Sequence, residues 1–178
     1  KRILLIEPPF YTLFGYERWH YPVTLTLIGT YLKEKGHEVM IYDADIPTSE
    51  CSSLTREGVR KNYHLYERSL GDKDNLAWSK AREKIQDFHP DIVGITSITP
   101  KIDSANIVAR IAKELFGDKV KVMLGGAHAE GMTKMFPDYD FGPYYDSVVT
   151  HIPNLVDRRP DKRLLLNYAL YSKKNFSS

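Results

Sequence analysis

Short aliphatic runs alternate with segments of helical periodicity along most of the chain. The first run is followed at once by Glu7, Pro8 and Pro9, which end it. Its unbroken hydrophobicity is typical of a strand that is buried on both faces of a parallel sheet. Comparable runs recur further along the sequence. The predicted strands are residues 3–6, 37–42, 92–96, 120–124 and 146–150.

Helices are predicted between these strands, because apolar residues recur there at intervals of three and four. Gly36 and Gly117 stand where two of these segments end, as helix-capping glycines do. Alternation with short connections indicates right-handed βαβ crossovers and a three-layer, doubly wound parallel sheet. Residues 46–76 follow neither period and predict a polar insertion with no more than a short helix. The predicted helices are residues 23–35, 77–88, 104–116 and a closing helix at 164–171.

Composition narrows the class of protein. The 178 residues are 42% hydrophobic, which is enough for one well-buried domain with decorations. The net charge of +2 creates no field that would attract nucleic acid or an anionic membrane, so neither is an expected partner. Cys51 is the single cysteine, which excludes an internal disulfide and a thiolate-ligated cluster and fits a cytoplasmic setting. The first aliphatic run is too short for a membrane span.

Candidate ligand-binding segments follow the strands, because ligands of open parallel sheets bind beyond the carboxyl ends of the strands. Residues 7–22 pack six aromatic side chains and His20 into a loop longer than a connection needs. Such a loop is typical of the wall or lid of a site, and an ordinary packed loop is the alternative. After the third strand, Thr96, Ser97 and Thr99 carry small hydroxyl groups that could donate to a ligand or cap the next helix.

The fourth strand is followed by Gly125 and Gly126, and then by a predicted helix that begins at Ala127 and His128. Two missing side chains let backbone amides at a helix N-terminus approach a ligand closely, and a tight turn is the alternative. Of the six histidines, His128 is the best placed to contact a ligand, and the spacing of the others fits no zinc site. The glycine patterns of dinucleotide-binding and phosphate-binding loops are absent, which disfavours nicotinamide, flavin adenine dinucleotide and nucleotide hydrolysis.

Several segments, taken in order, resemble the N-terminal cobalamin-binding domain of cobalamin-dependent radical S-adenosylmethionine (radical SAM) enzymes. They are the strand ending in Glu-Pro-Pro, the aromatic loop leading to Tyr21-Pro22, and the segments LKEKGHEVMIYDAD, HPDIVGITSITP and VMLGGAHAE. The resemblance implies an α/β, flavodoxin-like (Rossmann-like) fold with strand order 2-1-3-4-5. It implies that cobalamin lies across the strand ends, with its nucleotide tail buried in the crevice of the sheet. Residues 1–150 would form this domain, and residues 151–178 a helical extension or linker toward a radical SAM domain.

The resemblance also implies which residues bind the cofactor. Ser97 and Thr99 match the hydroxyl motif beside the tail, Gly125 and Gly126 match the double glycine that makes room for the tail, and residues 9–24 would lie near the corrin face. Where methionine synthase-type domains carry Asp-x-His-x-x-Gly, this chain has Glu-Pro-Pro-Phe, so no lower axial histidine is expected from that motif. An approach by His20 or a loop aromatic stays open. The candidate cofactor-binding residues are Pro9, Phe10, Tyr21, Pro22, Thr24, Thr96, Ser97, Thr99, Gly125, Gly126, Ala127, His128 and Thr150, and none is assigned to catalysis or to a metal.

The cysteine motif that ligates the iron-sulfur cluster of the radical enzymes is absent here. The resemblance therefore implies that this chain alone is not catalytic. Its parent protein would carry an iron-sulfur cluster and S-adenosylmethionine, and would act as a methyltransferase or cyclase on a small-molecule or lipid-like substrate. The join between Thr150 and His151 resembles two family segments with an intervening piece missing. The alternative function is a flavodoxin-like regulatory domain, or a nucleotide- or flavin-binding domain without catalysis.

Overall fold

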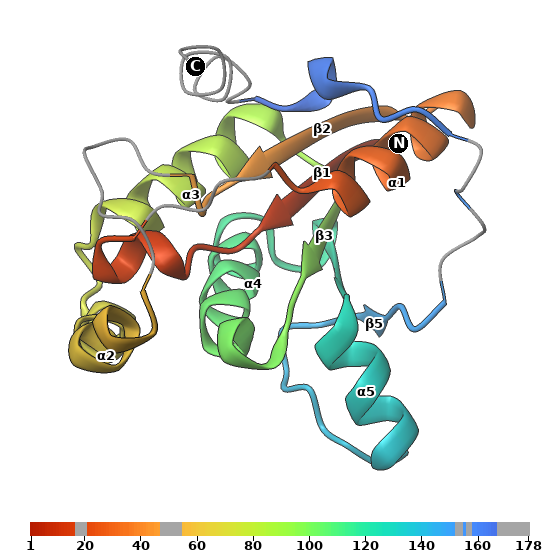
Figure 1. The fold of residues 1–178 in the computed structure, drawn as a ribbon. Helices are drawn as coiled ribbons and strands as arrows, with labels where there is room; N and C mark the ends of the chain where they lie inside the picture. Colours follow the sequence, from red (N-terminus) through yellow and green to blue (C-terminus); the bar gives the residue numbers. More distant parts are fainter. Residues whose placement is uncertain (17–20, 47–54, 152–154, 156–157, 167–178) are drawn as a thin grey trace.

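A five-stranded parallel sheet forms the centre of the computed structural model, which describes residues 1–16, 21–46, 55–151, 155 and 158–166 (Figure 1). Its strands are β1 (Arg2–Glu7), β2 (Glu38–Asp43), β3 (Ile92–Thr96), β4 (Lys121–Gly125) and β5 (Ser147–Val148). They lie in the order β2-β1-β3-β4-β5, and each neighbouring pair is parallel. The predicted flavodoxin-like fold and strand order are therefore confirmed.

Helices cover both faces of this sheet, which gives the three layers that the sequence predicts. The helix α1 (Val23–Glu34) lies on one face, and α3 (Leu76–Phe88) and α4 (Ile102–Phe116) lie on the other (Figure 1). All three begin and end within two residues of the predicted segments. The shorter α5 (Ala127–Met135) follows β4 and packs on the α4 side through Ala129. Within the described ranges, no helix is both long enough and apolar enough to cross a membrane.

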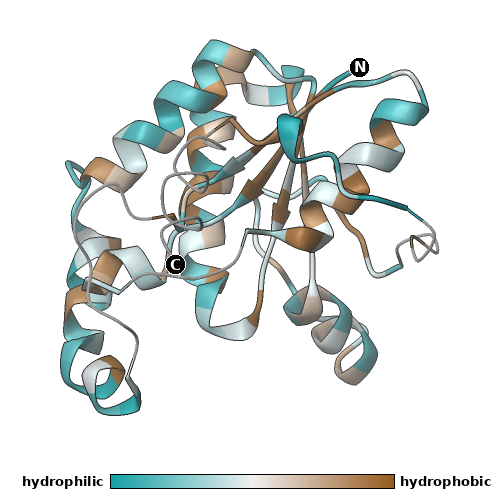
Figure 2. Ribbon diagram, turned by 45° about the horizontal axis from the view of Figure 1, so that its top comes forward, coloured by the Kyte–Doolittle hydropathy of each residue, from teal (hydrophilic) through white to brown (hydrophobic). Residues whose placement is uncertain are grey.

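The hydrophobic core is divided by the sheet into two layers. Leu4 and Ile6 of β1 face α3 and α4, whereas Ile3 and Leu5 face α1. This alternation follows from the pleat of a strand, in which neighbouring side chains point to opposite faces. Figure 2 shows the resulting concentration of hydrophobic residues along the central strands.

The polar insertion contains a long helix, α2 (Arg56–Gly71), so the prediction of no more than a short helix was wrong. Thr55 caps it by accepting a hydrogen bond from the Gly58 amide at 3.0 Å. Its apolar face packs on the loop after β1 instead of on the sheet, where Tyr66 joins a cluster with Phe10 and Phe14. Most residues of this helix are charged or polar, so its sequence suggested a polar insertion. Cys51 lies outside the described residues.

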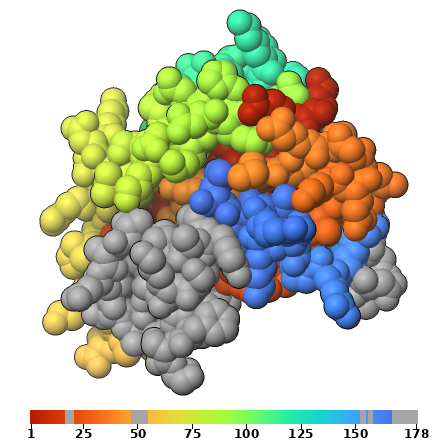
Figure 3. Space-filling view, turned by 90° about the horizontal axis from the view of Figure 1, so that it is seen from above, coloured from red at the N-terminus to blue at the C-terminus, as the bar shows by residue number. Residues whose placement is uncertain are grey.

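The C-terminal segment runs along α1 and the free edge of β2, where Figure 3 shows its blue residues covering orange ones. It contains a short 3-10 helix, η4 (Lys162–Leu164), after which Leu165 pairs with Ile41 of β2. The Leu166 amide donates to the Ile41 carbonyl at 2.8 Å. The predicted closing helix is wrong at Leu165 and Leu166, because this edge offers backbone partners to an extended chain; residues 167–171 lie outside the described part.

Candidate functional site

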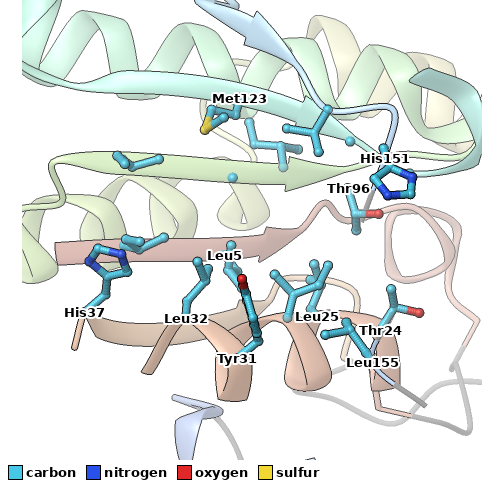
Figure 4. Close-up of a pocket in the computed structure, with 18 residues that line it drawn as sticks. Leu5, Thr24, Leu25, Tyr31, Leu32, His37, Thr96, Met123, His151 and Leu155 are labelled. Atoms are coloured by element: carbon cyan, nitrogen blue, oxygen red, sulfur yellow. The ribbon is translucent and has the colours of Figure 1, made fainter. Parts of the chain in front are cut away.

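A cavity of about 390 Å³ lies between the sheet and α1 (Figure 4). One end, which we call the mouth, lies at the carboxyl ends of the strands with Thr24, Thr96 and His151, and the opposite end lies near the half-buried His37. The volume is typical of a small-molecule site. The lining residues are Ile3, Leu5, Thr24, Leu25, Ile28, Tyr31, Leu32, His37, Ile92, Gly94, Ile95, Thr96, Met123, Gly125, Gly126, Val149, His151 and Leu155.

The cavity exists because the α1 face of β3 and β4 is built from small or half-buried residues. Gly94 pairs with Met123, and Thr96 pairs with Gly125, so two glycines remove side-chain volume from adjacent strands. A Cβ atom at position 94 would lie 2.8 Å from Leu5 Cδ2, so a side chain there would force the end of Leu5 to shift. Among the described elements, α1 and η4 cover this face over β1 and β2, which leaves an apolar recess beside them.

The two adjacent glycines have different physical roles. Gly126 has a φ of 95°, and a Cβ atom there would lie 2.6 Å from the Ser97 carbonyl oxygen and 2.7 Å from Thr96 Oγ1. Protein atoms thus already fill the space that we expected this glycine to keep open for a tail. At Gly125, a Cβ atom would make only ordinary contacts with Val149, at 3.7 and 3.9 Å. Gly125 is therefore the glycine whose side-chain space belongs to the cavity.

The N-terminus of α5 is tied to the end of β3. The His128 amide donates to the Ser97 carbonyl at 3.0 Å, so one of the free amides of this helix end is already used. The His128 ring lies beside Thr99, with 3.2 Å between Nδ1 and Oγ1, and packs edge-on against Tyr139 and Phe141. Its Nε2 is buried without a hydrogen-bond partner among the described residues. Burial lowers the pKa of the imidazole, so the ring is neutral at neutral pH.

The loop after β1 is held by a buried ion cluster that the sequence did not suggest. Lys101 donates to Glu7 at 2.5 Å and to Asp45 at 2.8 Å, and the side chains of Lys101 and Asp45 are 3% and 0% exposed. Asp45 also accepts from the Phe10 amide at 2.7 Å and from the Thr12 amide at 3.2 Å. The cluster therefore connects the carboxyl ends of β1 and β2 to the segment after β3.

The charge of Lys101 is stabilised by its partners. Burial alone would lower the pKa of its ammonium group, but Asp45 and Glu7 raise the pKa by more than burial lowers it. Lys101 is thus charged at neutral pH, and two carboxylates share one cation. The sequence contained only a weak signal for this cluster, since Glu7 ends β1 and Asp45 lies two residues after the neighbouring strand β2.

The residues at these strand ends can be compared with those of a receiver domain, which would be the regulatory alternative to cofactor binding. A receiver domain would need a phosphoacceptor aspartate at the end of β3, where Ser97 is buried and donates its hydroxyl to the Ile98 carbonyl at 2.9 Å. The carboxylates at the ends of β1 and β2 are already bound by Lys101 and by backbone amides. Among the described residues, no group of His, Cys, Asp or Glu side chains could hold a metal ion. The described residues at these strand ends therefore differ from the arrangement that a receiver domain needs.

The remaining candidate residues lie at different distances from the cavity. Pro9 and Phe10 are buried, and Phe10 belongs to the aromatic cluster on α2. Tyr21 packs against the core layer under α1, and Pro22 is the N-cap residue of α1. Thr150 is exposed after β5, and Ala127 is exposed at the first turn of α5.

The structure brings Thr24, Thr96, Gly125 and Gly126 together at the mouth of the cavity. Sequence reasoning missed the apolar walls and also His151. The sequence did contain a partial indication of the cavity, since alternate positions of β3 place a glycine and a threonine on the same face of the sheet. The sequence did not show which face of the sheet stays uncovered, because that depends on where α1 and the C-terminal segment pack.

Comparisons with known proteins agree with this fold. The family model described as "B12 binding domain" matches residues 16–151. An anaerobic magnesium-protoporphyrin IX monomethyl ester cyclase from Rubrivivax gelatinosus is 43% identical over 77 residues, which are 43% of this chain and 13% of that protein. A cytidylyl-2-hydroxyethylphosphonate methyltransferase from Streptomyces wedmorensis is 29% identical over 141 residues, which are 75% of this chain and 23% of that protein. The chain thus spans less than a quarter of the length of these relatives.

Proposed function

This chain belongs to the B12 binding domain family, and on that premise we propose that it is the cobalamin-holding module of a larger radical SAM enzyme. The single observation that carries the proposal is the apolar cavity on the α1 face, whose mouth lies at the carboxyl ends of β3 and β4. This is the position at which open parallel sheets bind ligands.

The residues of the cavity fit the nucleotide tail of cobalamin, which ends in an aromatic base. Leu5, Ile28 and Met123 offer apolar walls against which the faces of an aromatic ring can be buried. The Thr24 and Thr96 hydroxyl groups at the mouth can donate to the sugar and phosphate of the tail. We assign Ser97, Thr99, Ala127 and His128 to the surrounding strand ends, and residues 9–24 and Thr150 to the neighbourhood of the corrin ring.

The work of this chain is to bind and orient the cofactor. When bound, cobalamin supplies a cobalt centre that can carry a methyl group or exchange electrons. The residues that line the cavity would hold the tail, would exclude water from around it and would thereby orient the cofactor. Residues 7–10, directly at the end of β1, contribute no imidazole, because they are Glu-Pro-Pro-Phe, with Glu7 held by Lys101 and Phe10 by the aromatic cluster.

The parent protein is part of the proposal. Its relatives are a cyclase and a methyltransferase that are several times longer than the aligned segments. We propose that residues 1–150 form the cobalamin domain, that residues 46–76 are an insertion within it, and that residues 151–178 lead to a radical SAM domain. That domain would hold the iron-sulfur cluster and S-adenosylmethionine, and the enzyme would methylate or cyclise a small-molecule or lipid-like substrate.

Retention of cobalamin tests the proposal. The purified chain is mixed with hydroxocobalamin, free ligand is removed by gel filtration, and the visible spectrum of the protein fraction is recorded. We expect retained corrinoid with a shifted absorption band, because a protein site replaces water around the cofactor. A folded chain, verified by circular dichroism, that elutes without corrinoid would contradict the proposed function.

A further inference from the structure

The chemistry of the cavity interior bears on which corrinoid it accepts. We propose that the cavity selects a tail with a benzimidazole base over a tail with a purine base, and that Tyr31 is the residue that recognises the base. This inference rests on the proposed function, since it concerns the same cavity. It adds the class of cobamide that the site takes.

Polar side chains are distributed unevenly along the cavity. Thr24, Thr96 and His151 lie at the mouth, and His37 lies at the opposite end (Figure 4). Between them, Tyr31 is the polar side chain among the lining residues, and the other walls there are aliphatic or formed by Met123. A base that lies between the two ends therefore meets the Tyr31 hydroxyl group among apolar walls, and His37 is the next polar side chain beyond it.

Tyr31 is fixed in a position from which it can donate to that base. Figure 4 shows its hydroxyl group pointing from α1 toward the sheet, near Leu5. The ring itself is in contact with two cations, since Arg158 Cζ lies 4.9 Å and Lys35 Nζ 5.5 Å from the ring centroid. A ring held in this way can donate a hydrogen bond with little loss of side-chain freedom.

The two kinds of base place different demands on such a space. A benzimidazole that is not bound to cobalt has one free ring nitrogen, which accepts a hydrogen bond, and its remaining atoms are apolar. A purine such as adenine has several ring nitrogens and an exocyclic amino group. Each polar atom that loses water without gaining a partner is unfavourable, and a single tyrosine hydroxyl cannot satisfy all of them. The cavity therefore favours the benzimidazole.

A comparison of three corrinoids separates the contribution of the corrin ring to binding from that of the nucleotide tail. Dissociation constants are measured by absorbance titration for hydroxocobalamin, for the cobamide with an adenine base, and for cobinamide, which lacks the nucleotide. We expect the adenine cobamide to bind at least about 10-fold more weakly than cobalamin, because its base leaves polar atoms unpaired. Equal affinity of the two cobamides, within about threefold, would overturn the selectivity.

Tyr31→Phe tests the recognising residue, because it removes the hydroxyl group and keeps the ring. We expect cobalamin affinity to fall about 3- to 10-fold, as for the loss of one hydrogen bond, and cobinamide affinity to stay unchanged. Tyr145→Phe is the matched control, since the Tyr145 hydroxyl donates to Asn106 at 2.9 Å and does not line the cavity.

The outcomes distinguish this inference from the function on which it rests. If no corrinoid binds the folded chain, both the base selectivity and the proposed function are overturned. If cobalamin binds but Tyr31→Phe binds it as tightly as the unchanged protein, the role of Tyr31 is overturned while the proposed function stands. If Tyr31→Phe weakens cobinamide as much as cobalamin, the hydroxyl group does not act on the base, and its assignment is likewise overturned.

Discussion

Gly125→Leu is expected to weaken cobalamin binding by about 100-fold or more and to leave the fold intact. The backbone at Gly125 can accept a side chain, since a Cβ atom there would make only ordinary contacts with Val149. The rest of a leucine side chain would extend into the cavity, where the tail is proposed to lie. The measurement is an absorbance titration with hydroxocobalamin, with thermal unfolding recorded for the same sample.

Gly131→Leu is the matched control, because a Cβ atom at Gly131 of α5 meets no other atom within 4 Å. We expect it to bind cobalamin as the unchanged protein does. Gly126→Leu would be a poor test, because the clash with Ser97 disturbs the fold itself. Tight binding by a folded Gly125→Leu variant would show that the tail does not occupy this cavity.

Lys101→Met is expected to lower the free energy of unfolding by about 3–5 kcal/mol. The methionine fills a similar volume, but Glu7 and Asp45 lose their shared cation inside the protein. Since small domains are stable by only about 5–15 kcal/mol, this loss would leave a marginal fold. Urea denaturation followed by circular dichroism measures the change.

Lys134→Met provides the comparison, because Lys134 pairs with Glu130 on the surface, with side chains 70% and 49% exposed. We expect it to cost less than about 1 kcal/mol. The double variant Lys101→Met with Asp45→Asn should regain part of the stability lost by Lys101→Met, since it removes the charge of one of the two carboxylates that lose the Lys101 cation. The buried cluster would have no special role if Lys101→Met cost no more than Lys134→Met.

The sheet could be predicted from the sequence because parallel strands leave a strong signal. Both faces of β1 are covered, so residues such as Leu4 and Leu5 read as one aliphatic run. The order of the strands came from the resemblance to a family, since aliphatic runs do not specify which strand lies beside which. The helix α2 was missed because it packs on an aromatic loop and not on the sheet.

The site could be predicted only in part. The carboxyl ends of β3 and β4 were identifiable from Thr96 and Gly125, because the geometry of parallel sheets places ligands there. The interior of the cavity could not be predicted. Tyr31 and Met123 line it only because of where α1 packs on this face of the sheet, and the sequence does not show that position. Lys101 was missed for a similar reason, because Lys101 and its two partners, Glu7 and Asp45, come from three separate segments.

The most direct test follows the methyl groups of the methionines, of which the chain has four. Met123 lines the cavity, whereas Met40 packs into the core layer on the opposite face of the sheet. With ¹³C-methyl methionine labelling, the account predicts that hydroxocobalamin shifts the Met123 signal strongly, since an aromatic base would lie against it, and leaves Met40 nearly unchanged. Saturable binding of cobalamin with no change at Met123 would contradict the placement of the tail in this cavity.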